Sequence, residues 1–104
     1  MNRGKYEFPS EEEKQAWVKM VSWAIEGQLE GRVDEWDLSH LDITPYLLDK
    51  CVEACGWDWD FRCREREDCW NYYYHSDYPN HTLCIYADSS TFKLTLEVYE
   101  KEEE

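Results

Sequence analysis

Asp58 and Asp60 are two carboxylates separated by a single residue in the stretch GWDWDFRCRERED, residues 56–68. On a strand, side chains two positions apart share a face and lie about 6 to 7 Å from each other. That separation suits the acid pair of a hydrolase or the ligands of a divalent cation. Arg62 and Arg64 continue the same row, however, and cross-strand charge pairing on a solvated sheet accounts for all four residues. We therefore favour a solvent-facing row of charges over a catalytic pair.

Two cysteines and two histidines form a second arrangement that could do chemistry. Cys51 and Cys55 are followed by His75 and His81, which loosely fits the ligand spacing of small zinc sites. The two cysteines are also one helical turn apart within an apolar pattern, which is typical of buried thiols. A structural or regulatory protein with a metal or thiol site at these four residues is the alternative hypothesis, and no cofactor is predicted otherwise.

The sequence contains no pattern of an enzyme. A nucleophilic cysteine needs a nearby base, and none of the three histidines has a local signature with a cysteine. The four glycines form no phosphate-binding loop. We therefore predict that the protein is not catalytic.

The charge of the chain is strongly negative. Twenty-four Asp and Glu residues against 11 Lys and Arg give a net charge of −13 over 104 residues. The excess runs through the whole chain, with −5 up to Val52 and −8 beyond it. Such a field repels nucleic acid and anionic membranes and attracts basic proteins or cations. Solubility is the other explanation of this charge.

Cysteine usage and the absence of long apolar runs bear on the compartment. An odd number of cysteines argues against a closed disulfide framework, and no stretch is apolar enough for a signal peptide or a membrane span. These features predict a cytoplasmic protein with reduced thiols. The five cysteines are Cys51, Cys55, Cys63, Cys69 and Cys84.

Two helices are predicted in the first half of the chain. Ser10 and Glu13 form a capping box before an apolar pattern of helical period, and Gly31 is a suitable stop, so the first helix spans about residues 10–30. A connector, residues 31–43, follows. Thr44 then caps a second helix with Pro45 at its first position, and Gly56 ends it.

After Gly56 the apolar period changes from 3.6 to 2, which predicts strands at about 57–65, 69–76, 82–88 and 91–100. Short connectors make neighbouring strands antiparallel. The expected fold is a single α+β domain over residues 1–104, with two helices on one face of a four-stranded meander (ααββββ). Residues 1–9 and 101–104 are expected to be flexible ends.

Alternation assigns side chains to the two faces of this sheet. Trp57, Trp59 and Phe61 are predicted to line the helix-covered face, while Asp58, Asp60, Tyr86 and Tyr99 face water. The strand at 69–76 is ambiguous. Either Trp70, Tyr72 and Tyr74 point inward and Tyr73 and His75 outward, or a shift of one residue reverses the two sets.

Tyrosines mixed with carboxylates on an open sheet face suit protein binding, because tyrosine supplies contact area at low entropic cost. Surface tyrosines that merely cover a thin sheet are the competing explanation. An exposed edge strand can also pair with the same strand of a second copy, so a homodimer remains an alternative. The predicted partner-binding residues are Asp58, Asp60, Glu65, Glu67, Asp68, Tyr73, Tyr86 and Tyr99.

Acidic residues, with one tryptophan among them, form several short runs along the chain: Glu11–Glu13, Asp34, Glu35, Trp36, Asp37, Asp58, Asp60, Glu65, Glu67, Asp68 and the acidic tail. In these residues, and in size, acidity and density of Tyr and Trp, the chain resembles the small anti-defence proteins of phages and mobile elements, which include anti-CRISPR proteins and acidic DNA mimics. The resemblance is compositional and no family motif matches. It implies a stoichiometric inhibitor in a bacterial host cytoplasm that blocks the basic, nucleic-acid-binding surface of a nuclease complex.

Overall fold

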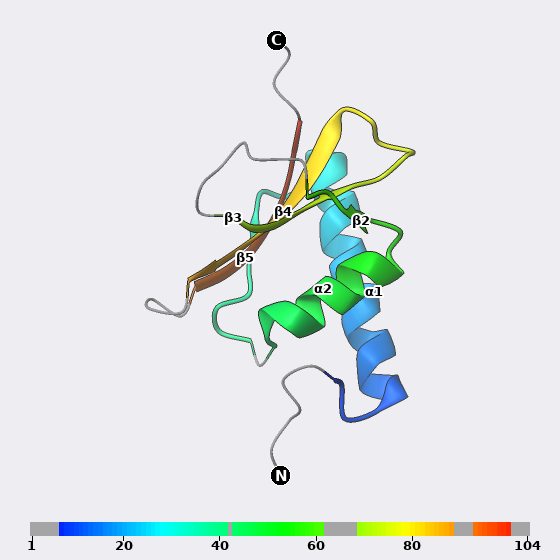
Figure 1. Ribbon diagram of the computed structural model, residues 1–104, viewed down its shortest axis with the longest axis vertical. Coiled ribbons are helices and arrows are strands. Elements are labelled where there is room, and N and C mark those ends of the chain that lie inside the picture. The colour runs from blue at the N-terminus through cyan, green and yellow to red at the C-terminus, as the bar shows by residue number, and fades with distance from the viewer. Residues whose placement is uncertain (1–6, 42, 62–68, 89–92, 101–104) are drawn as a thin grey trace.

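The computed structural model describes residues 7–41, 43–61, 69–88 and 93–100, and it has an α+β architecture. Two helices lie against one face of an antiparallel five-stranded sheet (Figure 1). The elements are α1 (Glu11–Leu29), β1 (Trp36–Asp37), α2 (Pro45–Ala54), β2 (Asp58–Trp59), β3 (Cys69–Tyr74), β4 (His81–Asp88) and β5 (Lys93–Glu100).

Both helices begin at the predicted caps. The Ser10 hydroxyl accepts a hydrogen bond from the Glu13 N–H at 3.1 Å, and the Thr44 hydroxyl accepts one from the Leu47 N–H at 3.2 Å. Each bond satisfies one of the amide groups that the first turn of a helix leaves unpaired. Pro45 follows Thr44 at the first helical position, where a missing N–H costs nothing.

Both helices also end in the same way, at a glycine with a positive φ. Gly31 has φ 74° and Gly56 has φ 93°. After α1 the Arg32 N–H bonds to the Gly27 carbonyl, and after α2 the Trp57 N–H bonds to the Val52 carbonyl. This is the pattern of the Schellman motif, and it turns the chain sharply from α2 into β2.

The strand order is β1-β5-β4-β3-β2, and every neighbouring pair is antiparallel. Strands β2 to β5 form the predicted meander. The expected count of four strands was one too low, because β1 lies in the segment predicted as a connector. Its two residues pair with β5, Trp36 opposite Leu96 and Asp37 opposite Thr95. Pairing of two residues leaves too short an alternating pattern to predict a strand from sequence.

The hydrophobic core lies between the helices and one sheet face, which we call the helix-covered face. In the register, Tyr73, Leu83 and Val98 lie side by side on this face. The second of the two predicted arrangements therefore holds for Tyr72, Tyr73 and Tyr74, with Tyr73 inward. It does not hold for Trp70, which also packs against the core, because the register shifts between Cys69 and Asn71. The buried core residues are Val21, Ile25, Leu38, Ile43, Leu47, Leu48, Cys51, Val52, Trp57, Tyr73, Leu83, Ile85, Leu94, Leu96 and Val98.

Gln28 joins α1 to the edge of β5. Its side-chain amide donates to the Leu96 carbonyl at 3.2 Å and accepts from the Val98 N–H at 2.7 Å. These two backbone groups lie at or just past the end of the short β1 pairing. The glutamine side chain thus extends the hydrogen bonding of this edge of β5 beyond the two residues of β1.

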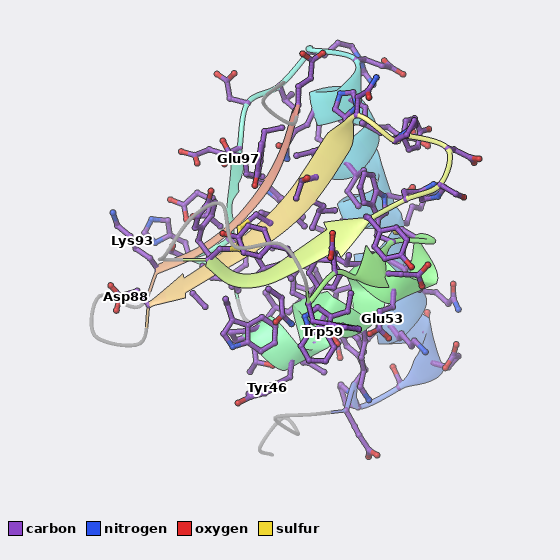
Figure 2. All side chains as sticks on the ribbon, turned by 45° about the horizontal axis from the view of Figure 1, so that its top comes forward. Tyr46, Glu53, Trp59, Asp88, Lys93 and Glu97 are labelled. Carbon is purple, nitrogen blue, oxygen red and sulfur yellow. A yellow bond between two sulfur atoms is a disulfide. The ribbon has the colours of Figure 1, made fainter. Side chains whose placement is uncertain are left out.

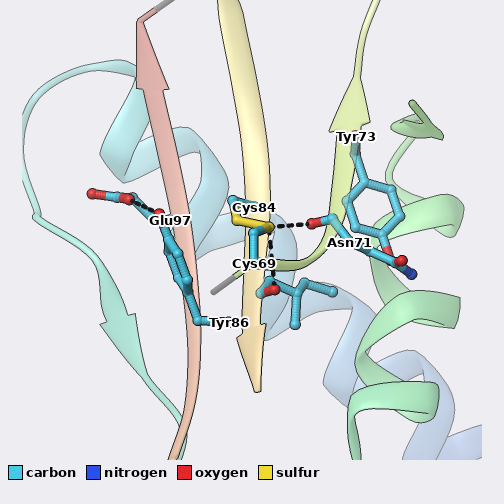
Figure 3. The surroundings of a disulfide bond; sticks show 7 residues. Cys69, Asn71, Tyr73, Cys84, Tyr86 and Glu97 are labelled. Atoms are coloured by element: carbon cyan, nitrogen blue, oxygen red, sulfur yellow. Dashed lines mark hydrogen bonds between the residues drawn. A yellow bond between two sulfur atoms is a disulfide. The ribbon is translucent and has the colours of Figure 1, made fainter. Parts of the chain in front are cut away.

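A disulfide bond joins Cys69 of β3 to Cys84 of β4, with a Cα–Cα distance of 6.3 Å (Figure 3). The prediction of reduced thiols is wrong for this pair, because adjacent antiparallel strands bring two distant cysteines within bonding range. An odd cysteine count excludes only the pairing of all five. Cys51 and Cys55 are free thiols, and Cys63 lies outside the described residues.

The opposite sheet face, which we call the outer face, carries Tyr72, Thr82, Cys84, Tyr86 and residues paired with them in the register. Tyr72, Thr82 and Cys84 are nevertheless buried, although the sequence predicted that this face is exposed to water. In the register Thr82 lies opposite a tyrosine of β5, and Cys84 lies opposite Tyr72, so large rings flank the small side chains. Neither α1 nor α2 is long and apolar enough to cross a membrane, and the described residues contain no other helix.

Candidate binding site at the edge of β2

A surface cleft of about 550 Å³ lies where the end of β2 meets the connection between β3 and β4. We call it the aromatic cleft. Its volume is within the range of sites that hold small ligands or single side chains of a partner. The described residues that line it are Trp59, Asp60, Phe61, Tyr74, His75, Ser76, Tyr78, Pro79 and His81.

Four aromatic side chains of the cleft are exposed to solvent: Trp59, Phe61, Tyr74 and Tyr78. Their exposed fractions range from 38% for Tyr78 to 64% for Phe61. Scattered exposed apolar residues are common on soluble proteins, but four large rings around one cleft form a patch of the kind that marks an interaction site.

The prediction that Trp59 and Phe61 pack in the core is therefore wrong. Of these three aromatic residues only Trp57 is buried, with 1% of its surface exposed. Trp59 shares the helix-covered face with its partner Tyr73, but β2 is the edge strand and only two residues long. An edge strand has a neighbour on one side only, so its large side chains have fewer atoms to pack against.

The back wall of the cleft rests on the core through stacked rings. The rings of Trp57 and Tyr78 are parallel, with centroids 5.9 Å apart and planes at 3°. The ring of His75 contacts both, with centroids 5.3 Å from Trp57 and 5.2 Å from Tyr78. Such aromatic contacts have defined geometry, so the buried Trp57 holds the orientation of the cleft wall.

Backbone and side-chain bonds shape the turn that follows β3. The Asp77 N–H donates to Nδ1 of His75 at 3.0 Å, and the Tyr78 N–H donates to the His75 carbonyl at 3.0 Å. Because Nδ1 accepts a hydrogen bond, the neutral imidazole carries its proton on Nε2. This turn places the ring of Tyr78 against Trp57.

Carboxylates lie in the cleft and in the hollow next to it. Asp60 lines it, and an adjoining hollow of about 100 Å³, which shares His75 and Tyr78, is also lined by Glu26 and Asp77. Among the described lining residues of both hollows there is no lysine or arginine. Aromatic faces beside carboxylates attract cations.

Of the predicted carboxylates, Asp58 is exposed on β2 and Asp60 is half-buried just after it. Asp58 pairs with Tyr74 and so lies on the outer face, and the backbone N–H of Asp60 donates to the Tyr72 carbonyl at 2.7 Å. Asp60 lines the aromatic cleft, whereas Asp58 is not among the residues that line it. The other three predicted carboxylates, Glu65, Glu67 and Asp68, lie outside the described residues.

Tyr73 does not serve as an exposed anchor, contrary to the prediction. It is fully buried, its hydroxyl donates to the Asp49 carboxylate of α2, and it accepts from the Asn71 side-chain amide at 3.1 Å. Burial raises the pKa of Tyr73, and the bond to Asp49 adds to the rise. The role of Tyr73 is thus to tie β3 to α2, because the strand register turns it inward.

Tyr86 and Tyr99 are half-buried on the outer face. The Tyr86 hydroxyl donates to the Glu97 carboxylate at 2.9 Å across the β4–β5 pair (Figure 3). These two tyrosines lie on the predicted face of the sheet, but neither lines the aromatic cleft. The structure brings Asp60 together with exposed aromatics that were not predicted as binding residues.

The four residues of the alternative metal site do not form a metal-binding group. Cys51 is buried in the core, and burial raises the pKa of its thiol to about 12. Burial also raises the pKa of Cys55, and metals bind the thiolate. His75 and His81 lie in the aromatic cleft instead. Within the described parts of the chain, no three His, Cys, Asp or Glu residues are arranged to hold a metal ion.

A second hollow, of about 520 Å³, lies at the other end of the sheet. It is lined by apolar residues that include Leu41 and Trp70, and by both Asp88 and Lys93. Figure 2 shows Asp88 and Lys93 at the far end of the β4–β5 hairpin from Trp59. Because it carries charges of both signs, this hollow lacks the electrostatic preference of the aromatic cleft.

The aromatic cleft could have been suspected from the sequence in one respect. Trp57, Trp59 and Phe61 place three large aromatics on alternate positions of one short strand, which is more than an edge strand can bury. Tyr78 sits in the stretch DYPN, whose Asp, Pro and Asn favour a turn. Sequence offers no signal that this turn lies against β2.

No protein-family model matches the chain, and neither a curated protein nor a solved structure shows significant similarity to it.

Proposed function

We propose that the protein is a non-catalytic acidic binding module that occupies the basic surface of a nucleic-acid-binding protein, such as a nuclease complex, and thereby inhibits it. The observation that supports this proposal is the aromatic cleft. It combines exposed rings of Trp59, Phe61, Tyr74 and Tyr78 with the carboxylate of Asp60, and its described lining residues include no lysine or arginine.

The physical argument has two parts. Large aromatic side chains supply most of the binding free energy at many protein interfaces, and here they are already exposed on a wall that stacks on the core. The net charge of −13 accelerates encounter with a basic surface and disfavours nucleic acid and other acidic proteins. A basic surface built to bind nucleic acid meets both requirements.

The proposal is tested first by capture. The immobilised protein is exposed to nuclease-treated bacterial lysate, washed at low and then high salt, and the retained proteins are identified by mass spectrometry. A captured nucleic-acid-binding protein is then purified and assayed for loss of nucleic-acid binding when the acidic protein is added. We expect stoichiometric inhibition that weakens as salt rises.

Charge reversal locates the surface. Asp58→Lys with Asp60→Lys should slow association and weaken inhibition, with little change in stability because Asp58 is exposed and Asp60 only half-buried. The matched control is Asp34→Lys with Glu35→Lys, which makes the same change in net charge at exposed positions just before β1, at the opposite edge of the sheet. Equal effects of the two double variants would show that only overall charge matters and would remove this surface from consideration.

A further inference from the structure

We propose that the aromatic cleft binds an arginine side chain of the partner. This inference rests on the proposed function, and it names the group that enters the cleft. The starting point is the geometry of Trp59 and Phe61. Their rings are 6.0 Å apart between centroids, with planes at 77°, and both are more than half exposed. They present two aromatic surfaces at nearly a right angle to each other.

A planar cation suits such surfaces better than a neutral or spherical group. The guanidinium of arginine stacks on an aromatic face and is less strongly hydrated than the ammonium of lysine, so it loses less solvation when it enters a cleft. Indole is the most favourable ring for this interaction, and Trp59 supplies an exposed one.

The charges around the cleft have the sign that an arginine requires. Asp60 lines the cleft. Asp77, in the turn between β3 and β4, lines the adjoining hollow, and its side chain is 80% exposed. Asp58, the residue before Trp59 on β2, is exposed as well. A phosphate or carboxylate ligand would meet these groups with like charge, which disfavours nucleotides and acidic peptides as occupants.

The volume indicates more than one bare side chain. At about 550 Å³ the cleft holds an arginine together with the neighbouring backbone of the segment that carries it. Tyr74 at the end of β3 and Tyr78 in the turn that follows it also line the cleft. They offer hydroxyl groups and ring edges for that backbone. The occupant is therefore an arginine in an extended or looped basic segment of a protein.

The test is an NMR titration of the intact chain with capped tripeptides. The probe is Gly-Arg-Gly, and the matched controls are Gly-Lys-Gly and the neutral isostere Gly-citrulline-Gly. We expect the arginine peptide to shift the indole N–H of Trp59 and the ring signals of His75 and Tyr78 at millimolar concentration. The lysine peptide should bind several-fold more weakly, and the citrulline peptide should leave these signals in place.

Substitution separates the cleft from general charge. Trp59→Ala should weaken binding of the arginine peptide by about fivefold to thirtyfold, the loss of one cation–π contact. Trp23→Ala removes an equally exposed tryptophan from α1, outside the cleft, and should leave the affinity unchanged. Thermal melts followed by circular dichroism confirm that both variants remain folded, as expected for exposed side chains.

Two results would overturn the inference: equal binding of the arginine and citrulline peptides, or arginine-dependent shifts that Trp59→Ala leaves intact. Its failure is distinguishable from failure of the proposed function. Capture of a basic protein that is insensitive to Trp59→Ala supports the proposed function and contradicts the arginine site. Specific arginine binding with no inhibition of any captured nucleic-acid-binding protein supports the arginine site and contradicts the proposed function.

Discussion

The indole ring of Trp57 lies parallel to the phenol ring of Tyr78, with ring centroids 5.9 Å apart. Trp57 is buried at the end of α2, whereas Tyr78 is partly exposed in the turn between β3 and β4. This contact connects the hydrophobic core directly to the surface of the aromatic cleft. The orientation of the cleft wall therefore depends on the packing of one core residue.

Substitutions at the two stacked rings should have unequal effects. Trp57→Ala removes a fully buried side chain and should lower the free energy of unfolding by about 3–5 kcal/mol. Tyr78→Ala should cost about 1 kcal/mol, because the ring is 38% exposed and loses mainly the stacking contact. Urea unfolding measures both, with Tyr78→Phe as a control that keeps the ring. A loss on Tyr78→Ala as large as on Trp57→Ala would contradict this assignment of roles.

The two helix-ending glycines differ in their surroundings. A Cβ at Gly31 would have no heavy atom within 4 Å, whereas one at Gly56 would lie 2.9 Å from Nε2 of His75. Both residues have positive φ, so Gly31→Ala should cost about 1 kcal/mol and Gly56→Ala more. Only Gly56→Ala should displace His75 and change its ring signals in NMR spectra. Equal unfolding free energies for the two variants would show that the contact with His75 relaxes freely.

Gln28 should contribute more than a surface glutamine. Gln28→Ala removes the side chain that bonds to the Val98 N–H and the Leu96 carbonyl. This loss should lower the free energy of unfolding by about 1–3 kcal/mol. Gln15→Ala is the control, because Gln15 bonds only to the exposed Glu11 within α1. Hydrogen exchange offers a local measurement, in which the Val98 amide should exchange faster in Gln28→Ala. Unchanged protection of that amide would argue against the bridge.

Glu53 should make stability depend on pH. Burial raises the pKa of its carboxyl, and the charges of Asp49 and Asp58 add to the rise. A raised pKa means that the folded protein disfavours the ionised form, so Glu53 becomes less unfavourable as pH falls through that pKa. Glu53→Gln should therefore stabilise the protein at pH 7, by a few tenths of a kcal/mol at this largely exposed site. The gain should vanish below the ordinary pKa of glutamate.

Thermal melts of wild type and Glu53→Gln at pH 7 and pH 4 check this prediction. Glu12→Gln provides the control, since Glu12 lies in the first turn of α1, where a negative charge favours the helix. That substitution should give no stabilisation at pH 7. A benefit of Glu53→Gln that persists unchanged at pH 4 would mean that the ionised form of Glu53 is not its source.

The Cys69–Cys84 bond closes a loop with a sequence separation of 15 residues. On the chain-entropy model, closing a loop of this length stabilises the fold by about 3 kcal/mol. A reductant should lower the melting temperature of the wild type and leave the variant Cys69→Ala with Cys84→Ala unaffected. Peptide mapping under non-reducing conditions should recover the two cysteines in one linked fragment. Linkage of either to another cysteine would contradict this pairing.

The sequence by itself determined the helices and most of the sheet. Ser10, Thr44 and Pro45 mark helix starts, and Gly31 and Gly56 mark helix ends, because capping is local and depends on residues within a few positions. The alternation in β4 and β5 also predicted which of their side chains pack under the helices, since one face of these central strands is apolar. The order of these elements along the chain was sufficient for the α+β class.

Only the tertiary structure decided the inward side of β3, the pairing of β1 with β5, the disulfide and the exposure of Trp59 and Phe61. Tyr72, Tyr73 and Tyr74 are chemically equivalent in the sequence, and their directions follow from the register with β4. Trp59 and Phe61 carry the pattern of core residues. They became surface residues because β2 is a two-residue edge strand with a neighbour on one side, and burial depends on neighbours that are distant in the sequence.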